Sequence, residues 1–216
     1  MAIRAWAQYY DWVLPELPGS PPTGLVDEIC RAVSRDFCDE TKVYQVELTP
    51  INIVAGTASY NLATADPTNL EVSEVLDVWH NSNRLTPKTR DELKRLYLPR
   101  WQDKTGTPEF YTQYDQNNLV LVPYPDKALT AGLQVTAAIM PTLASVGLID
   151  VIFDRWAEDL AKGIKAQMML QPKKPWSNPE LANYYWGHYE AARDNTKSSV
   201  QKSFVRARPR TRGRFF

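Results

Sequence analysis

Residues 149–168 read IDVIFDRWAEDLAKGIKAQM, and the apolar side chains in this stretch recur every three or four positions. The recurring positions are Ile149, Ile152, Phe153, Trp156, Leu160, Ile164 and Met168. Such a period predicts the apolar face of an amphipathic helix. Asp150 is placed to cap its first turn, and Pro172 and Pro175 end the helix.

Helical patterns also lie on both sides of this stretch. After it, Ser177-Asn178-Pro179 supplies a capping side chain and then a proline at the first helical position. The stripe that follows predicts a second long helix to about Ser199, on Leu181, Tyr184, Tyr185, His188, Tyr189 and Ala192. Much earlier, a third helix is expected from about Gly24 to Asp39, on Leu25, Val26, Ile29, Cys30, Val33 and Phe37.

Between these helices the hydrophobic period changes to two, which is typical of strands. The alternating runs are residues 44–48, 51–54, 59–62, 71–79, 110–114, 119–122 and 133–139, separated by turn residues such as Ala55-Gly56-Thr57. One short helix is expected inside this region, from Thr89 to Tyr97. Residues 43–141 therefore look like a β-rich unit.

The fold class predicted from this order is α+β. We expect a helical bundle, with one helix before and two after an inserted β-rich domain, and an extended C-terminal arm. The expected boundaries are 1–23 for an extended lead-in, 24–42 with 142–200 for the helical domain, 43–141 for the β-rich domain and 201–216 for the arm. The lead-in is expected to be extended because four prolines in residues 14–22 remove backbone donors and fix φ.

The charge is unevenly divided along the chain. Residues 197–216 carry seven basic side chains and no carboxylate, although the whole chain has 25 basic and 25 acidic residues. Residues 1–196 therefore carry 18 basic against 25 acidic residues, a formal net charge of −7. An acidic body with a basic arm indicates that the arm meets a partner.

Several partners suit the arm. Its arginines lie at every second position, Arg206, Arg208, Arg210, Arg212 and Arg214, and would share one face if the arm were extended. They could lie along phosphates with sequence-independent affinity, or pair with an acidic protein and anchor through Phe215 and Phe216. A solubilising tail leaves the two phenylalanines without a role, and a membrane arm lacks an amphipathic pattern.

Few side chains offer enzyme chemistry. The chain has two histidines, His80 and His188, and no glycine-rich phosphate loop, nucleophile elbow or Cys-x-x-Cys pair. Asp150, Asp154 and Glu158 could share a helix face and hold a divalent ion, but acidic residues also favour a first helical turn for electrostatic reasons alone. Cys30 and Cys38 are too far apart along one helix for a disulfide and read as core thiols. We expect no enzyme, cofactor or metal site.

No stretch of about 18 apolar residues occurs, and no export signal is evident at the N-terminus. The expected place of synthesis is a cytoplasm, without a membrane partner.

The succession of motifs resembles the head-to-tail adaptor (connector) proteins of tailed bacteriophages, particularly the tail tubular adaptors of short-tailed phages. The matching segments run along most of the chain, at residues 14–19 (LPELPG), 35–38 (RDFC), 48–50 (LTP), 54–62 (VAGTASYNL), 106–108 (GTP), 121–126 (LVPYPD), 174–179 (KPWSNP) and the basic, Phe-ended tail.

The resemblance implies a structural virion protein at the head-tail junction. It implies a ring, usually of twelve copies, that joins the portal protein to the tail (nozzle or tube) proteins and lines a channel through which DNA passes without specific binding. It also implies that the arm, residues 203–216, docks on the portal through Arg206, Arg208, Arg210, Arg212, Arg214, Phe215 and Phe216. The alternative is a small nucleic-acid-binding module that uses the same tail, and a metal-assisted hydrolase at Asp150, Asp154 and Glu158 ranks third.

Overall fold

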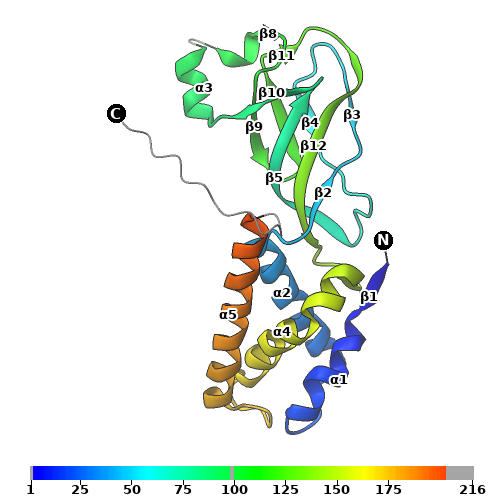
Figure 1. Ribbon diagram of the computed structural model, residues 1–216, viewed down its shortest axis with the longest axis vertical. Coiled ribbons are helices and arrows are strands. Elements are labelled where there is room, and N and C mark those ends of the chain that lie inside the picture. Colours follow the sequence, from blue (N-terminus) through cyan, green and yellow to red (C-terminus); the bar gives the residue numbers. More distant parts are fainter. Residues whose placement is uncertain (1, 98–99, 203–216) are drawn as a thin grey trace. The chain divides into compact units, whose positions relative to one another are not determined.

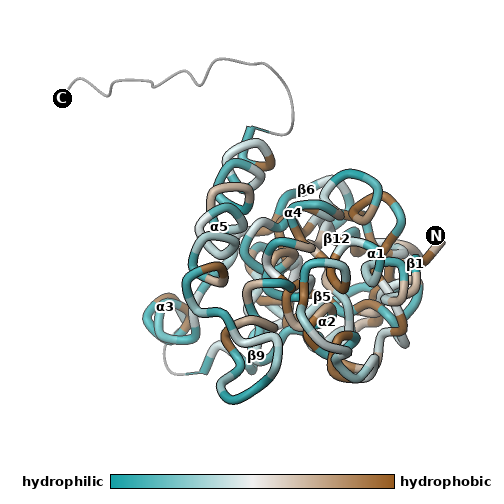
Figure 2. The backbone as a smooth tube through the Cα atoms, turned by 90° about the horizontal axis from the view of Figure 1, so that it is seen from below, coloured by the Kyte–Doolittle hydropathy of each residue, from teal (hydrophilic) through white to brown (hydrophobic). Residues whose placement is uncertain are grey.

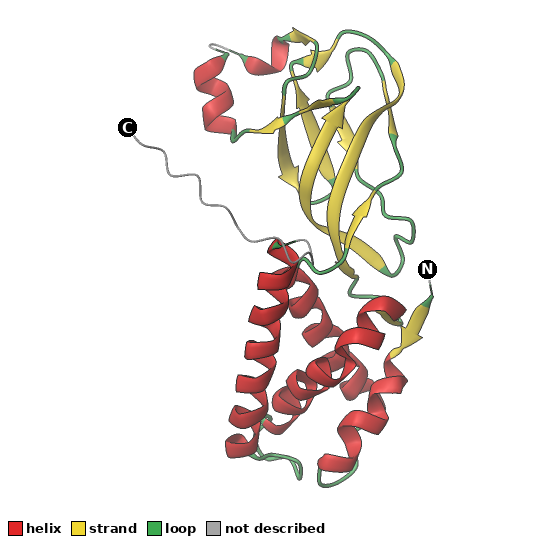
Figure 3. Ribbon diagram, viewed as in Figure 1, coloured by secondary structure: helices red, strands yellow, loops and turns green. Residues whose placement is uncertain are grey.

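The computed structural model describes residues 2–97 and 100–202, and it confirms a mixed α+β protein (Figures 1 and 3). The chain divides into two compact units. One unit combines Met1–Val43 with Val146–Phe216 and holds the long helices, and the other is Tyr44–Ser145 and holds most of the strands.

Three long helices make the centre of the helical unit. They are α2 (Thr23–Thr41), α4 (Asp150–Met169) and α5 (Pro179–Gln201), and each contacts the other two. Their apolar stripes meet at Phe37 of α2, whose ring centroid lies 6.0 Å from that of Trp156 and 6.3 Å from that of Tyr189. Cys30 and Cys38 are buried in this core as free thiols, as their spacing predicted.

The lead-in before α2 is not an extended segment throughout. It forms β1 (Ile3–Ala5), the 3-10 turn η1 (Trp6–Tyr9), the short helix α1 (Tyr10–Val13) and a second 3-10 turn, η2 (Leu14–Glu16). Trp6, Tyr9 and Val13 are buried, and this apolar burial offsets the cost of ordering the segment. Pro15 lies inside η2, and the other three prolines fall in residues 17–22, which form no helix or strand before α2 begins.

The start of α4 also differs from expectation. β1 pairs antiparallel with β13 (Gly147–Ile149), with Ile3 opposite Ile149, and the Asp150 backbone N–H donates to the carbonyl of Ala2. The N-cap position is Ile149, so Asp150 is the first helical residue and does not cap the turn. A strand pair formed by residues far apart in sequence therefore sets the entry into α4.

The capping motif of α5 was predicted correctly. The Asn178 side chain accepts a hydrogen bond of 3.2 Å from the Leu181 backbone N–H, and Pro179 occupies the first helical position. The buried residues of α5 are Ala182, Tyr189, Thr196 and Val200. Of the six residues in the predicted stripe, only Tyr189 is buried. In Figure 2 most of α5 is hydrophilic or neutral in colour.

Two larger sheets and one short strand pair form the described part of the β unit. The first has the order β2-β12-β5-β6 with β3 also on β12, and the second has the order β4-β10-β9-β7. Their bounds are β2 (Gln45–Glu47), β3 (Ile51–Ile53), β4 (Ser59–Asn61), β5 (Leu70–His80), β6 (Asn83–Arg84), β7 (Thr86–Pro87), β9 (Phe110–Asp115), β10 (Asn118–Val122) and β12 (Leu129–Pro141). The pair β8 (Thr105–Gly106) and β11 (Tyr124–Pro125) is parallel.

One apolar core joins the two sheets. Val72, Val78 and Val135 of the first sheet are buried in the same cluster as Leu119 and Leu121 of the second. The predicted short helix is α3 (Arg90–Leu96), followed by the 3-10 turn η3 (Trp101–Asp103). Thr89 and Glu92 form a capping box at the start of α3, because each side chain bonds the other residue's backbone N–H.

Candidate interaction surfaces

The side chains predicted to dock on a partner lie outside the described residues. The last residue that the structure describes is Lys202. The predicted docking residues all follow it: Arg206, Arg208, Arg210, Arg212, Arg214, Phe215 and Phe216. α5 ends at Gln201, and the predicted docking residues follow it in the sequence. The role of these residues stays a prediction.

Polar contacts anchor α5 to α2. The Tyr189 hydroxyl donates to Asp36 Oδ2 at 2.9 Å, and Arg193 reaches the same oxygen at 3.0 Å. Burial raises the pKa of Tyr189 well above its ordinary value, and the nearby Asp36 carboxylate raises it further. One turn beyond, Lys197 pairs with Glu40 at 3.0 Å. The helix that carries the arm is therefore tied to α2 by ion pairs as well as by apolar contacts.

The N-terminal half of α5 presents aromatic residues to solvent. The Tyr184 side chain is 59% exposed, and its ring centroid lies 4.5 Å from that of the exposed His188. Both residues belong to the stripe that predicted the helix, and the structure shows that they are exposed. Exposed tyrosines on a helix are typical of protein interfaces.

A second cluster, which the sequence analysis missed, ties the N-terminal segment to α4 and α5. The Lys165 ammonium on α4 lies 2.9 Å from Glu16 Oε1, and its side chain is only 9% exposed. Tyr185 of α5 donates a short hydrogen bond to the other oxygen of Glu16. This bond, followed by the one from Lys165, lowers the pKa of Glu16. Lys165 could have been noticed because it lies one turn from each of the apolar residues Ala161 and Met169.

The carboxylates considered for a metal ion do not gather. Asp154 pairs with Arg4 at 3.4 Å, Glu158 pairs with Lys162 at 3.2 Å, and Asp150 accepts from the Val151 backbone N–H at 2.9 Å. Within residues 2–97 and 100–202, no three His, Cys, Asp or Glu side chains are grouped as metal ligands would be. These carboxylates therefore act as ordinary surface and helix-end charges.

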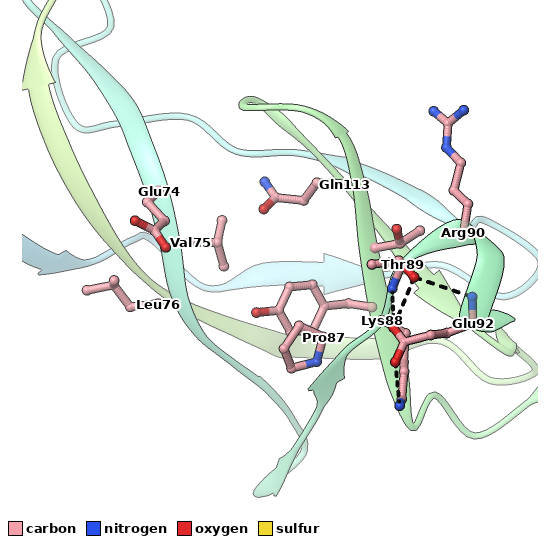
Figure 4. A pocket seen from close by; sticks show the side chains of 11 residues that line it. Glu74, Val75, Leu76, Pro87, Lys88, Thr89, Arg90, Glu92 and Gln113 are labelled. Atoms are coloured by element: carbon pink, nitrogen blue, oxygen red, sulfur yellow. Dashed lines mark hydrogen bonds and ion pairs between the residues drawn. The ribbon is translucent and has the colours of Figure 1, made fainter. Parts of the chain in front are cut away.

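An open groove crosses the β unit between β5 and β9 (Figure 4). Its largest cavity has a volume of about 660 Å³ and lies between residues 74–76 of β5, residues 87–92 around the start of α3, and residues 111–113 of β9. Figure 4 shows Val75 and Gln113 directed into the space and Arg90 directed away from it. Cavities of about 320 and 290 Å³ extend the groove, the first past Asp77 and the second past Asp115.

The charges around this groove are mostly paired. Lys88 lies 3.2 Å from Glu92, Arg84 pairs with Asp77, and the Arg90 guanidinium lies 3.8 Å from the centre of the Tyr114 ring. Such a groove has the size of a ligand pocket but lacks the convergent reactive groups of an active site.

No helix among the described residues is both long and apolar enough to span a membrane.

The comparisons with known proteins are consistent with a structural role. No curated protein matches the chain significantly. The sequence profile of the SU10 adaptor protein family matches residues 2–212, which is nearly the whole chain and includes both units and most of the basic arm. That family consists of bacteriophage structural adaptors, a class that the succession of sequence motifs had already suggested. The chain therefore belongs to the SU10 adaptor protein family.

Proposed function

We propose that the chain is the ring-forming subunit of a head-to-tail adaptor. In this proposal about twelve copies join the portal protein to the tail proteins and surround the channel through which DNA leaves the head. The single observation that carries the proposal is the family match over residues 2–212.

The charge division supports the same function. A body of net charge −7 repels phosphate, so DNA can slide past it without being held. The basic arm is suited to the opposite task, because its arginines can pair with carboxylates and its two terminal phenylalanines can enter apolar pockets. We propose that the arm docks on the portal, with Phe215 and Phe216 as anchors.

Attachment to the portal tests this proposal. The full chain, a Phe215→Ala/Phe216→Ala variant and a Val54→Ala variant are compared for copurification with portal particles. Val54 is a matched control because its side chain is apolar and 55% exposed but lies in the β unit. Loss of attachment in the double variant alone supports docking through the arm. Equal attachment of all three proteins contradicts it.

A further inference from the structure

The groove between β5 and β9 is bordered by strand edges that the fold leaves uncovered. β7 covers the outer edge of β9 at Phe110 and Tyr111, and the Lys88 backbone N–H donates to the Tyr111 carbonyl at 2.9 Å. The chain then leaves the sheet to form α3. Over residues 112–115, no further strand of the described chain pairs with this edge.

The opposite wall of the groove, β5, also has an edge that is only partly paired. β12 pairs with β5 along one side, whereas on the other side β6 pairs only with Trp79 and His80. The β5–β12 pair shifts register twice, and the β9–β10 pair shifts once, between Gln113 and Asp115. The edge of β9 is the better template for an added strand, because β7 already pairs with it in parallel at Phe110 and Tyr111. The groove follows β5 from Ser73 to Asp77, roughly 13 Å at the rise of a strand, which is the length of about five extended residues.

The charge at the open end of the groove is negative. Glu74 and Asp115 line the same cavity from opposite walls. Hydrogen bonds from the Asn118 side chain and the Asn117 backbone lower the pKa of Asp115, so it is ionised at neutral pH. Burial raises the pKa of Tyr111 on the floor, and the nearby Asp77 and Glu74 raise it further, against the opposing effect of Arg84. An added segment should therefore be basic.

The arm contains a segment with these properties. Residues 204–208 read FVRAR and contain no carboxylate. Pro209 sets the end of this segment, because proline has no backbone N–H to donate to a neighbouring strand. In a strand, Val205 and Ala207 would lie on one face and Arg206 and Arg208 on the other. The small side chains can face the floor of the groove while the arginines reach the carboxylates at its rim.

We propose that residues 204–208 of one copy add a strand to the edge of β9 in a second copy, with Arg206 and Arg208 toward Glu74 and Asp115. The choice of a second copy rests on the ring of the proposed function. Pro209 separates this strand from residues 210–216, which stay available to the portal. Arms exchanged in this way would link neighbouring copies through main-chain hydrogen bonds.

Disulfide trapping with full-length chains tests the exchange. A Gln113→Cys protein is mixed with a Val205→Cys protein under mild oxidation, and linked pairs are measured by mass under non-reducing conditions. Gln113 is chosen because its side chain points into the groove (Figure 4), and the natural Cys30 and Cys38 are buried. We expect linked pairs from the mixture, few from either protein alone, and few when Val54→Cys replaces Gln113→Cys.

A chain that carries both Gln113→Cys and Val205→Cys shows whether the arm binds the groove of a second copy or the groove of its own chain. Disulfide-linked species with twice the mass of the chain or more support binding between copies. A disulfide that forms within one chain, without a change of mass, overturns the inference. The absence of any link in the mixture also overturns it. If the portal still retains the unlinked protein, the inference fails and the adaptor function stands.

A charge variant tests the recognition chemistry in the same assay. Glu74→Lys replaces an attraction with a repulsion, so the yield of linked pairs should fall by about tenfold. Glu47→Lys is the control, because Glu47 is also exposed but lies on β2 and does not line the groove. An equal yield from Glu74→Lys and Glu47→Lys would contradict the assigned role of the carboxylates.

Discussion

A Cβ atom on Gly163 of α4 would lie 2.8 Å from Cδ2 of Tyr189 on α5. The same atom would lie 2.9 Å from a methyl group of Val33 on α2, so glycine is needed where the three helices approach most closely. A glycine inside a helix costs about 1 kcal/mol relative to alanine, which this close packing offsets.

Gly163→Ala should therefore lower the free energy of unfolding by about 1–3 kcal/mol, because overpacking exceeds the gain in helix propensity. Chemical denaturation measures the change. Gly187→Ala on α5 is the matched control, since apart from its chain neighbours and the backbone of its own helix no atom lies within 4 Å of the added methyl group. That control should leave stability unchanged or raise it by up to about 1 kcal/mol. A stabilising Gly163→Ala would disprove the close packing.

Glu16→Gln should destabilise the helical unit at neutral pH by about 1 kcal/mol, since it leaves Lys165 buried without its ion pair. The folded pKa of Glu16 lies below its ordinary value of 4.5, so the carboxylate contributes stability above pH 4.5. This contribution is lost as the pH falls through the folded pKa. Unfolding curves for both proteins should converge in acid, and a constant difference from pH 7 to pH 3 would contradict the assignment.

Asn178→Ala should cost about 1 kcal/mol, because the first turn of α5 then loses a side-chain acceptor for the Leu181 N–H. Thermal unfolding followed by far-UV circular dichroism measures this loss. Asn183→Ala removes an exposed amide from the same helix without touching the cap, and it should change the midpoint much less. Equal effects from the two variants would mean that the cap does not stabilise the helix.

Duplex DNA should bind the full chain weakly at physiological salt. The acidic body opposes the attraction of the basic arm, and the proposed function requires DNA to pass without being held. Fluorescence anisotropy at several salt concentrations measures this affinity. Tight binding that falls steeply with salt would favour the nucleic-acid-binding alternative.

The sequence predicted those elements whose signals are local. The Asn178-Pro179 cap, the period of α4 and the longer strands β5, β9, β10 and β12 all depend on neighbouring residues, and the structure confirms them. The misplaced Asp150 cap depends on Ile3 pairing with Ile149, and that partner lies far along the chain. The spacing of apolar residues alone also could not show which side of α5 is buried, because that side is the one that contacts α2 and α4.

The groove could not be predicted for the same reason. It exists because β7 is two residues long and β9 is six, and because β5 and β9 belong to different sheets. Glu74 and Asp115 are 41 residues apart in the sequence, and only the order of the strands brings them to one cavity. The arm was recognisable from composition, but a surface that could receive it was not.

The helical unit is assembled from two pieces of chain, Met1–Val43 and Val146–Phe216, with the whole β unit between them. During synthesis, α2 therefore leaves the ribosome long before α4 and α5 exist. In that interval only the N-terminal segment around η1 can cover part of its apolar face. The β unit is continuous and can fold first. The helical unit can therefore close only after the whole β unit has been made.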